Sequence, residues 1–149
     1  MSIASATLQH DVLLWLRDKL ISSLTDPVSR TGNEKFVMTS WPERPVRYPV
    51  VILEIIGESS KPLGVGVEAS NVTLRVRIHV FSKSTAQRDA IADEIFRKLE
   101  QTQLDITGSA LAGLHDFKLL NSFNQDEAGE GGLHRKIIDV SYTFNTTQG

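Results

Sequence analysis

Residues 71–82 read NVTLRVRIHVFS, and apolar and polar side chains alternate along most of this stretch. One face carries only apolar residues, namely Val72, Leu74, Val76, Ile78 and Val80. The other face carries Thr73, Arg75, Arg77 and His79. Because successive side chains of a strand point to opposite faces, the pattern predicts a strand with one core face and one polar face. This pattern is typical of an antiparallel sheet whose second face meets solvent or another subunit.

Three further strands are predicted around this one. Residues 48–57, YPVVILEIIG, form an apolar and β-branched run that indicates a central strand. Residues 58–66 follow as a flexible turn region that is rich in serine, glycine and proline. The segments 117–123 and 135–144 then predict a third and a fourth strand, of which the last presents alternate apolar side chains to one side.

Two amphipathic helices are expected to cover the apolar face of this sheet. Residues 4–24 carry a wide apolar stripe, and Ser84 or Thr85 can cap a second helix that runs to about residue 101. The order is helix, long arm, strand, strand, helix, strand, strand. It predicts an α+β fold with a small, mostly antiparallel sheet of about four strands and two α-helices packed on one face. The length of 149 residues fits a single domain over residues 1–149.

Two connecting segments attract functional interest. The arm at about residues 25–47 is dominated by turn residues, and only residues 36–39 could make a short strand. A connection of this length inside a compact domain is a candidate for reaching a neighbouring molecule. The second segment, about residues 124–132, reads NQDEAGEGG and predicts a mobile acidic hairpin tip.

Composition excludes several classes of protein. The net charge of −2 argues against a dedicated nucleic-acid binder, because phosphate neutralisation needs a strongly basic surface. Without any cysteine, the chain has no disulfide, no thiolate zinc site and no cysteine nucleophile. Asp11, Arg17, Asp18 and Lys19 interrupt the apolar residues of the N-terminal segment, so neither a signal peptide nor a membrane span is expected there.

No motif for catalysis or for a cofactor is present. The four histidines, His10, His79, His115 and His134, lie in different segments without metal-ligand spacing. His79, on the polar face of a strand, and His134, at the start of another, are interpreted as surface or interface residues. No GxSxG elbow, phosphate-binding loop or dinucleotide fingerprint occurs. We therefore expect no catalytic residue, no cofactor and no metal ion. A small enzyme remains a third interpretation, which would require a pocket with convergent titratable groups.

Several residues are candidates for protein contacts instead. Trp41 lies in the segment TSWPERP, residues 39–45, where it either tucks back on its own domain or anchors an interface. Arg44 and Arg47 make the arm mildly basic, which suits head-to-tail contact with an acidic patch, although a solvated loop would have the same composition. The acidic patch is the hairpin tip with Asp126, Glu127 and Glu130, which is either simply solvated, a cation site, or a channel lining from which DNA is repelled.

Two segments together resemble the tail-terminator and tail-completion family of long-tailed phages. They are RPVRYPVVILEIIG, residues 44–57, and VTLRVRIHVFSKSTAQRDAIADEIFRKLE, residues 72–100. In that family a proline-aromatic start leads into a strand, and a second strand ends in an aromatic residue and a serine-rich turn before a helix. The C-terminal GGLHRKIIDVSYTF is similar to the family's last strand.

The resemblance implies a virion structural protein that forms a homo-oligomeric ring, usually of six subunits, at the head-proximal end of the tail tube. Its partners would be the tail tube protein and the head-tail connector or stopper, with DNA only as passing cargo and no membrane contact. Such a protein is assembled in the host cytoplasm and ends in the virion. Interface residues would then include the loop with Lys61, Leu63 and Val65. A neck or head-closure connector of the same virion is the alternative.

Overall fold

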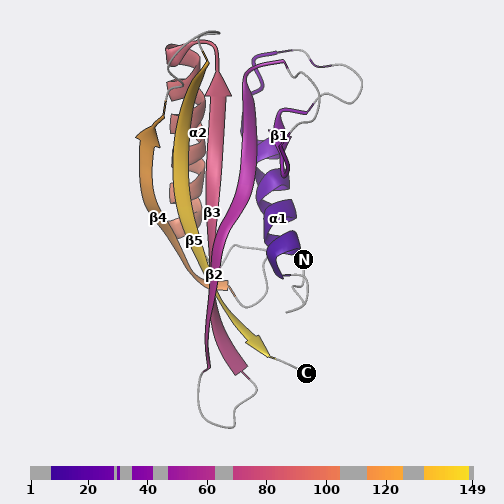
Figure 1. The fold of residues 1–149 in the computed structure, drawn as a ribbon, viewed down its shortest axis with the longest axis vertical. Coiled ribbons are helices and arrows are strands. Elements are labelled where there is room, and N and C mark those ends of the chain that lie inside the picture. Colours follow the sequence, from indigo (N-terminus) through magenta and orange to yellow (C-terminus); the bar gives the residue numbers. More distant parts are fainter. Residues whose placement is uncertain are drawn as a thin grey trace.

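The computed structural model describes residues 8–28, 30, 35–41, 47–62, 69–104, 114–125 and 133–147. Two helices and five strands form an α+β fold, which confirms the predicted class (Figure 1). In chain order the elements are α1 (Leu8–Ser23), β1 (Val37–Met38), β2 (Val50–Pro62), β3 (Ala69–Ser82), α2 (Thr85–Leu104), β4 (Leu114–Asn124) and β5 (His134–Thr147).

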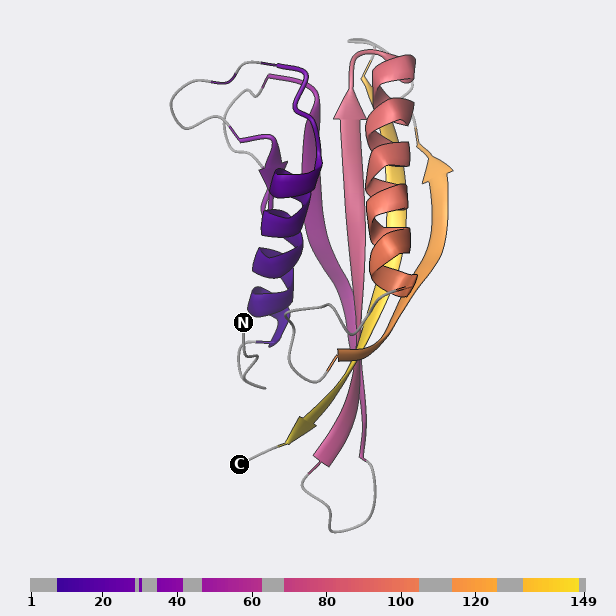
Figure 2. The same cartoon turned by 180° about the vertical axis from the view of Figure 1, so that it is seen from behind.

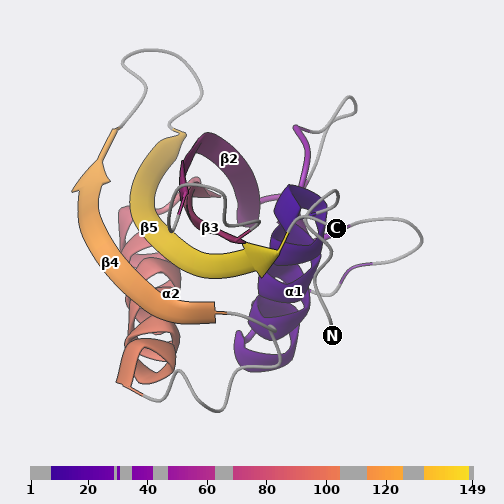
Figure 3. The same ribbon diagram turned by 90° about the horizontal axis from the view of Figure 1, so that it is seen from below.

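The five strands form one sheet in the order β1-β2-β3-β5-β4. The pairs β2 with β3, β3 with β5, and β5 with β4 are antiparallel, whereas β1 runs parallel to β2. The sheet thus has one strand more than the four or so predicted, and the additional strand β1 lies within residues 36–39, where a short strand was considered. The extra strand arises because the arm returns to the sheet, where Val37 and Met38 pair with Val51 and Ile52. Seen from below, the successive strands form a strongly twisted and curved sheet (Figure 3).

Both helices lie on one face of this sheet, as predicted (Figure 2). The alternating apolar residues of β3 are all buried in the main core. Helix α1 contributes Val12, Leu16 and Leu20 to this core, and α2 contributes Ile91, Ile95 and Leu99. Strand β5 adds its own alternating set, Ile138, Val140, Tyr142 and Phe144. Strand residues spaced two apart and helix residues spaced about four apart therefore pack together in one apolar layer.

The region expected to be a turn after residue 57 is partly strand. Residues from Glu58 to Pro62 continue β2 and pair with β3, from Leu74 back to Ser70. Strand β5 continues beside them to Thr147, so that three strands project beyond the helices (Figure 1). Pairing with a long neighbour overrides the low strand preference of this serine-rich segment.

Candidate interface on the open face of the sheet

The face of the sheet opposite the helices, called the open face below, carries a row of polar residues across four strands. Glu54 on β2 is in register with Arg77 on β3. Arg77 is in register with Asp139 on β5, which in turn pairs with Asn121 on β4. The polar face of β3 that the sequence predicted thus belongs to a polar row that spans four strands.

Arg77 and Asp139 form a two-pronged ion pair at the centre of this row. The Nε atom of Arg77 donates to Oδ1 of Asp139 at 2.9 Å, and a terminal guanidinium nitrogen donates to Oδ2 at 3.1 Å. The hydrogen bond to Asp139 raises the pKa of Arg77 against the opposing effect of burial, so the guanidinium stays charged. The Asp139 side chain is only 8% exposed. Its carboxylate therefore depends on Arg77 for charge compensation.

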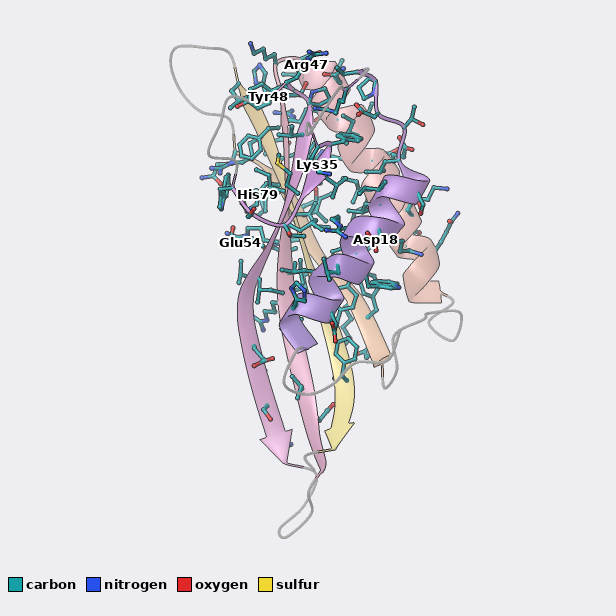
Figure 4. All side chains as sticks on the ribbon, turned by 90° about the vertical axis from the view of Figure 1, so that its right-hand side faces the viewer. Asp18, Lys35, Arg47, Tyr48, Glu54 and His79 are labelled. Atoms are coloured by element: carbon teal, nitrogen blue, oxygen red, sulfur yellow. The ribbon has the colours of Figure 1, made fainter. Side chains whose placement is uncertain are left out.

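His79 and Glu54 form a second pair beside the first. The His79 Nε2 atom lies 2.8 Å from Oε2 of Glu54, and both side chains point away from α1 (Figure 4). Burial lowers the pKa of His79, although the hydrogen bond to Glu54 opposes this effect, so the imidazole is neutral at pH 7. His79 is 4% exposed, which corrects its interpretation as a surface histidine. The Glu54 side chain is 41% exposed, so the carboxylate and not the imidazole is presented to other molecules.

Trp41 explains why a histidine on the polar face is buried. The Trp41 ring centroid lies 5.0 Å from that of His79 and 5.8 Å from that of Phe81. Trp41 itself remains 50% exposed. Below it, Val50, Ile52 and Phe81 form a small second core on the open face. Trp41 thus covers its own sheet with one side of the ring and keeps the other side available to a partner.

A second aromatic side chain lies across the sheet from Trp41. Phe123 on β4 is 38% exposed, and the Arg77 guanidinium lies 5.9 Å from its ring centroid. Exposed aromatic residues next to arginine are the composition that protein interfaces favour. Sequence reasoning missed Phe123 and Glu54, because only the strand register brings them close to the Arg77 row.

The start of β2 is fixed by an arginine of the arm. The Arg30 side chain is 8% exposed and forms an ion pair with Asp26 at 2.7 Å. It also donates to the carbonyl oxygen of Arg47 at 2.7 Å and to that of Pro49. Arg30 therefore links Asp26, near the beginning of the arm, to Arg47 and Pro49, which directly precede β2.

The predicted contact residues lie at two different ends of the molecule. Trp41 and Arg47 are exposed near the start of β2, whereas Lys61 is exposed near the end of the same strand. Trp41 covers the open face near the start of β2, whereas Lys61 pairs with Asn71 on the same side of the sheet but near the other end of this strand. The remaining candidates, namely Arg44, Leu63, Val65, Asp126, Glu127 and Glu130, lie outside the described residues.

Among the residues that the structure describes, no group of three or more histidine or acidic side chains could hold a metal ion. Within the same ranges, neither helix is long and apolar enough to cross a membrane.

Comparison with solved structures finds a similar fold in a chain from the virion of a native gene transfer agent (GTA) particle. The two chains superpose with a TM-score of 0.54 at 15% sequence identity. The match covers 74% of this chain and 78% of that chain. No protein-family model and no curated protein sequence matches this chain. At this level of identity the likeness concerns the fold.

Proposed function

We propose that this protein is a structural component of a virion, where it forms a ring at the head-proximal end of a phage-type tail tube. In this position it ends tube polymerisation and docks the tail to the head connector. The observation that carries the proposal is the fold shared with a chain from a gene transfer agent virion. The resemblance of residues 44–57 and 72–100 to the tail-terminator family supports the same role independently.

The side chains of the open face favour a role in protein assembly over a catalytic role. Four of its ionisable side chains are paired with one another, Arg77 with Asp139 and His79 with Glu54. The one imidazole in this group is buried and covered by Trp41, so a substrate does not reach it directly. By contrast, Trp41 and Phe123 are apolar groups left exposed on the same face. We therefore propose that the protein acts by binding other proteins and has no catalytic activity.

Electron microscopy of particles assembled without this protein tests the role. A virus that lacks the gene is expected to produce over-long or headless tails, because nothing stops the addition of tube subunits. Normal detached tails beside leaking or empty heads would instead indicate a connector of the neck. Unaltered infectious particles would contradict both roles.

A further inference from the structure

Strands β2 and β4 have inserted residues at the same level of the sheet. The pairing of β2 with β3 shifts between Ile55 and Gly57, which leaves Ile56 as the extra residue. The pairing of β4 with β5 shifts between Leu119 and Asn121, which leaves Leu120 as the extra residue. Ile55 and Leu119, the residues just before the two insertions, belong to a single row that runs through Val76 and Val140.

Both inserted residues are large, apolar and exposed. Ile56 is 39% exposed and Leu120 is 46% exposed. Bulges and charges are the usual means by which proteins protect a sheet edge from pairing with another chain. A bulge that served only this purpose would not need an apolar side chain in water. Among the described residues β1 pairs only with Val51 and Ile52, so at Ile56 strand β2 forms one edge of the sheet and β4 the other, and the two bulges place apolar groups at opposite edges.

The surroundings of the two bulges differ in charge. Glu54 and Glu58 stand two residues before and two residues after Ile56 on β2, and both are at least partly exposed. Lys118 stands two residues before Leu120 on β4, and its side chain is 62% exposed. The Oδ2 atom of Asp116 lies 3.4 Å from Nζ of Lys118 and partly compensates the positive charge of the lysine. The β2 edge is thus acidic around its apolar group, whereas the β4 edge has a lysine next to its own.

We propose that these edges are the two halves of a contact between copies of this chain, in which Leu120 of one copy packs against Ile56 of the next. Lys118 and Glu54 both lie on the open face, in register with Ser141 and Arg77, so Lys118 then approaches Glu54 and sets the orientation. Because each copy offers two different surfaces, the contact is head-to-tail and can repeat until a ring closes. The bulges interrupt a regular hydrogen-bond ladder, so side chains and not continuous strand pairing carry the contact. This inference rests on the proposed ring.

Cysteine cross-linking in assembled particles tests the contact, and the chain contains no native cysteine that would interfere. Particles that carry Ile56→Cys together with Leu120→Cys are treated with a short bis-maleimide. A ladder of covalent multimers up to the size of the ring is expected. Each single variant should give no covalent dimer, and a mixture of the two single variants should give dimers and nothing larger.

A matched control uses Ile21→Cys together with Leu120→Cys. Ile21 is an apolar residue on α1 with 52% exposure, similar to the two bulge residues, and it should give no ladder. Covalent dimers from either single variant would indicate a symmetric contact and overturn the proposal. If the double variant is present in particles and gives no ladder, the edge contact is wrong and the virion role stands. If the wild-type protein is absent from particles, the proposed function itself fails.

Discussion

Replacement of Trp41 by alanine probes the cover over the open face. A tryptophan side chain buries on the order of 200 Å² when fully enclosed. Because Trp41 is 50% exposed, its side chain buries about half of that area in the folded protein. The variant loses this buried area. At about 25 cal/mol per Å², the lost burial corresponds to about 2.5 kcal/mol, and a compact unfolded state reduces this value to about 2 kcal/mol. We expect the variant to fold with this loss in the free energy of unfolding.

The same substitution should change the titration of His79. Burial is the main cause of the lowered pKa of His79, and the Trp41 ring lies 5.0 Å from the imidazole. Removal of the indole admits water, so the pKa of His79 should rise toward its ordinary value of 6.5. Urea denaturation at pH 7.5 measures the stability, and an NMR titration of the imidazole measures the pKa.

Two results would refute this reasoning. A loss above about 4 kcal/mol would be typical of a fully buried aromatic residue and would make Trp41 part of the core. An unchanged pKa of His79 would mean that the indole does not shield the imidazole from water. The control is Ile21→Ala on α1, which removes a side chain of similar exposure and should leave the His79 titration unchanged.

Four other variants test polar side chains of the sheet. Tyr142→Phe removes a fully buried hydroxyl that has no hydrogen-bond partner within the described residues, so the free energy of unfolding should stay equal or rise by about 1 kcal/mol in thermal or urea unfolding. Arg77→Met leaves the Asp139 carboxylate uncompensated and should cost about 3 kcal/mol, whereas Asp139→Asn should cost less, because a third of the Arg77 side chain already meets water. Equal losses in urea titrations of both variants would contradict this order. His79 has a folded pKa below 6.5, so the unfolded state binds the proton more tightly and stability should fall as pH drops through 6.5 toward the folded pKa. His79→Gln should remove this part of the pH dependence, and an identical pH profile for the two proteins would exclude His79 as its source.

Local alternation was sufficient to predict which side of each long strand faces the core. Val72 to Val80 on β3 and Ile138 to Phe144 on β5 alternate without interruption, and the structure buries the predicted set in both cases. The helices were equally clear, because their apolar residues recur at helical spacing. These features depend on residues close together in the sequence.

The bulges and the pairing of the short first strand were not predictable in the same way. Ile55 and Ile56 form one apolar run in the sequence, and nothing in that run marks one of them as inserted. The bulge becomes visible only in the pairing of β2 with β3. Strand β1 has two residues, and its pairing with Val51 and Ile52 depends on how the arm returns to the sheet. Both features are consequences of tertiary pairing and not of local preference.

The candidate interface was predicted only in part. Trp41 was recognised as a residue that either covers its own domain or binds a partner, and it lies on its own sheet with half of its surface free. His79 was placed on the correct face of β3 but was expected at the surface. Its burial requires Trp41, which is 38 positions away in the chain, and its partner Glu54 lies on another strand. Such contacts between distant residues leave no periodic signal in one sequence.

The position of the protein in an assembled particle is the most direct test of the proposed role. A gold label attached to the C-terminus can be located by electron microscopy in intact particles and in detached tails. The proposed role predicts label at the head-proximal end of the tail and nowhere else. Label along the length of the tube, at the distal tip, or only in unassembled protein would contradict a ring that ends the tube.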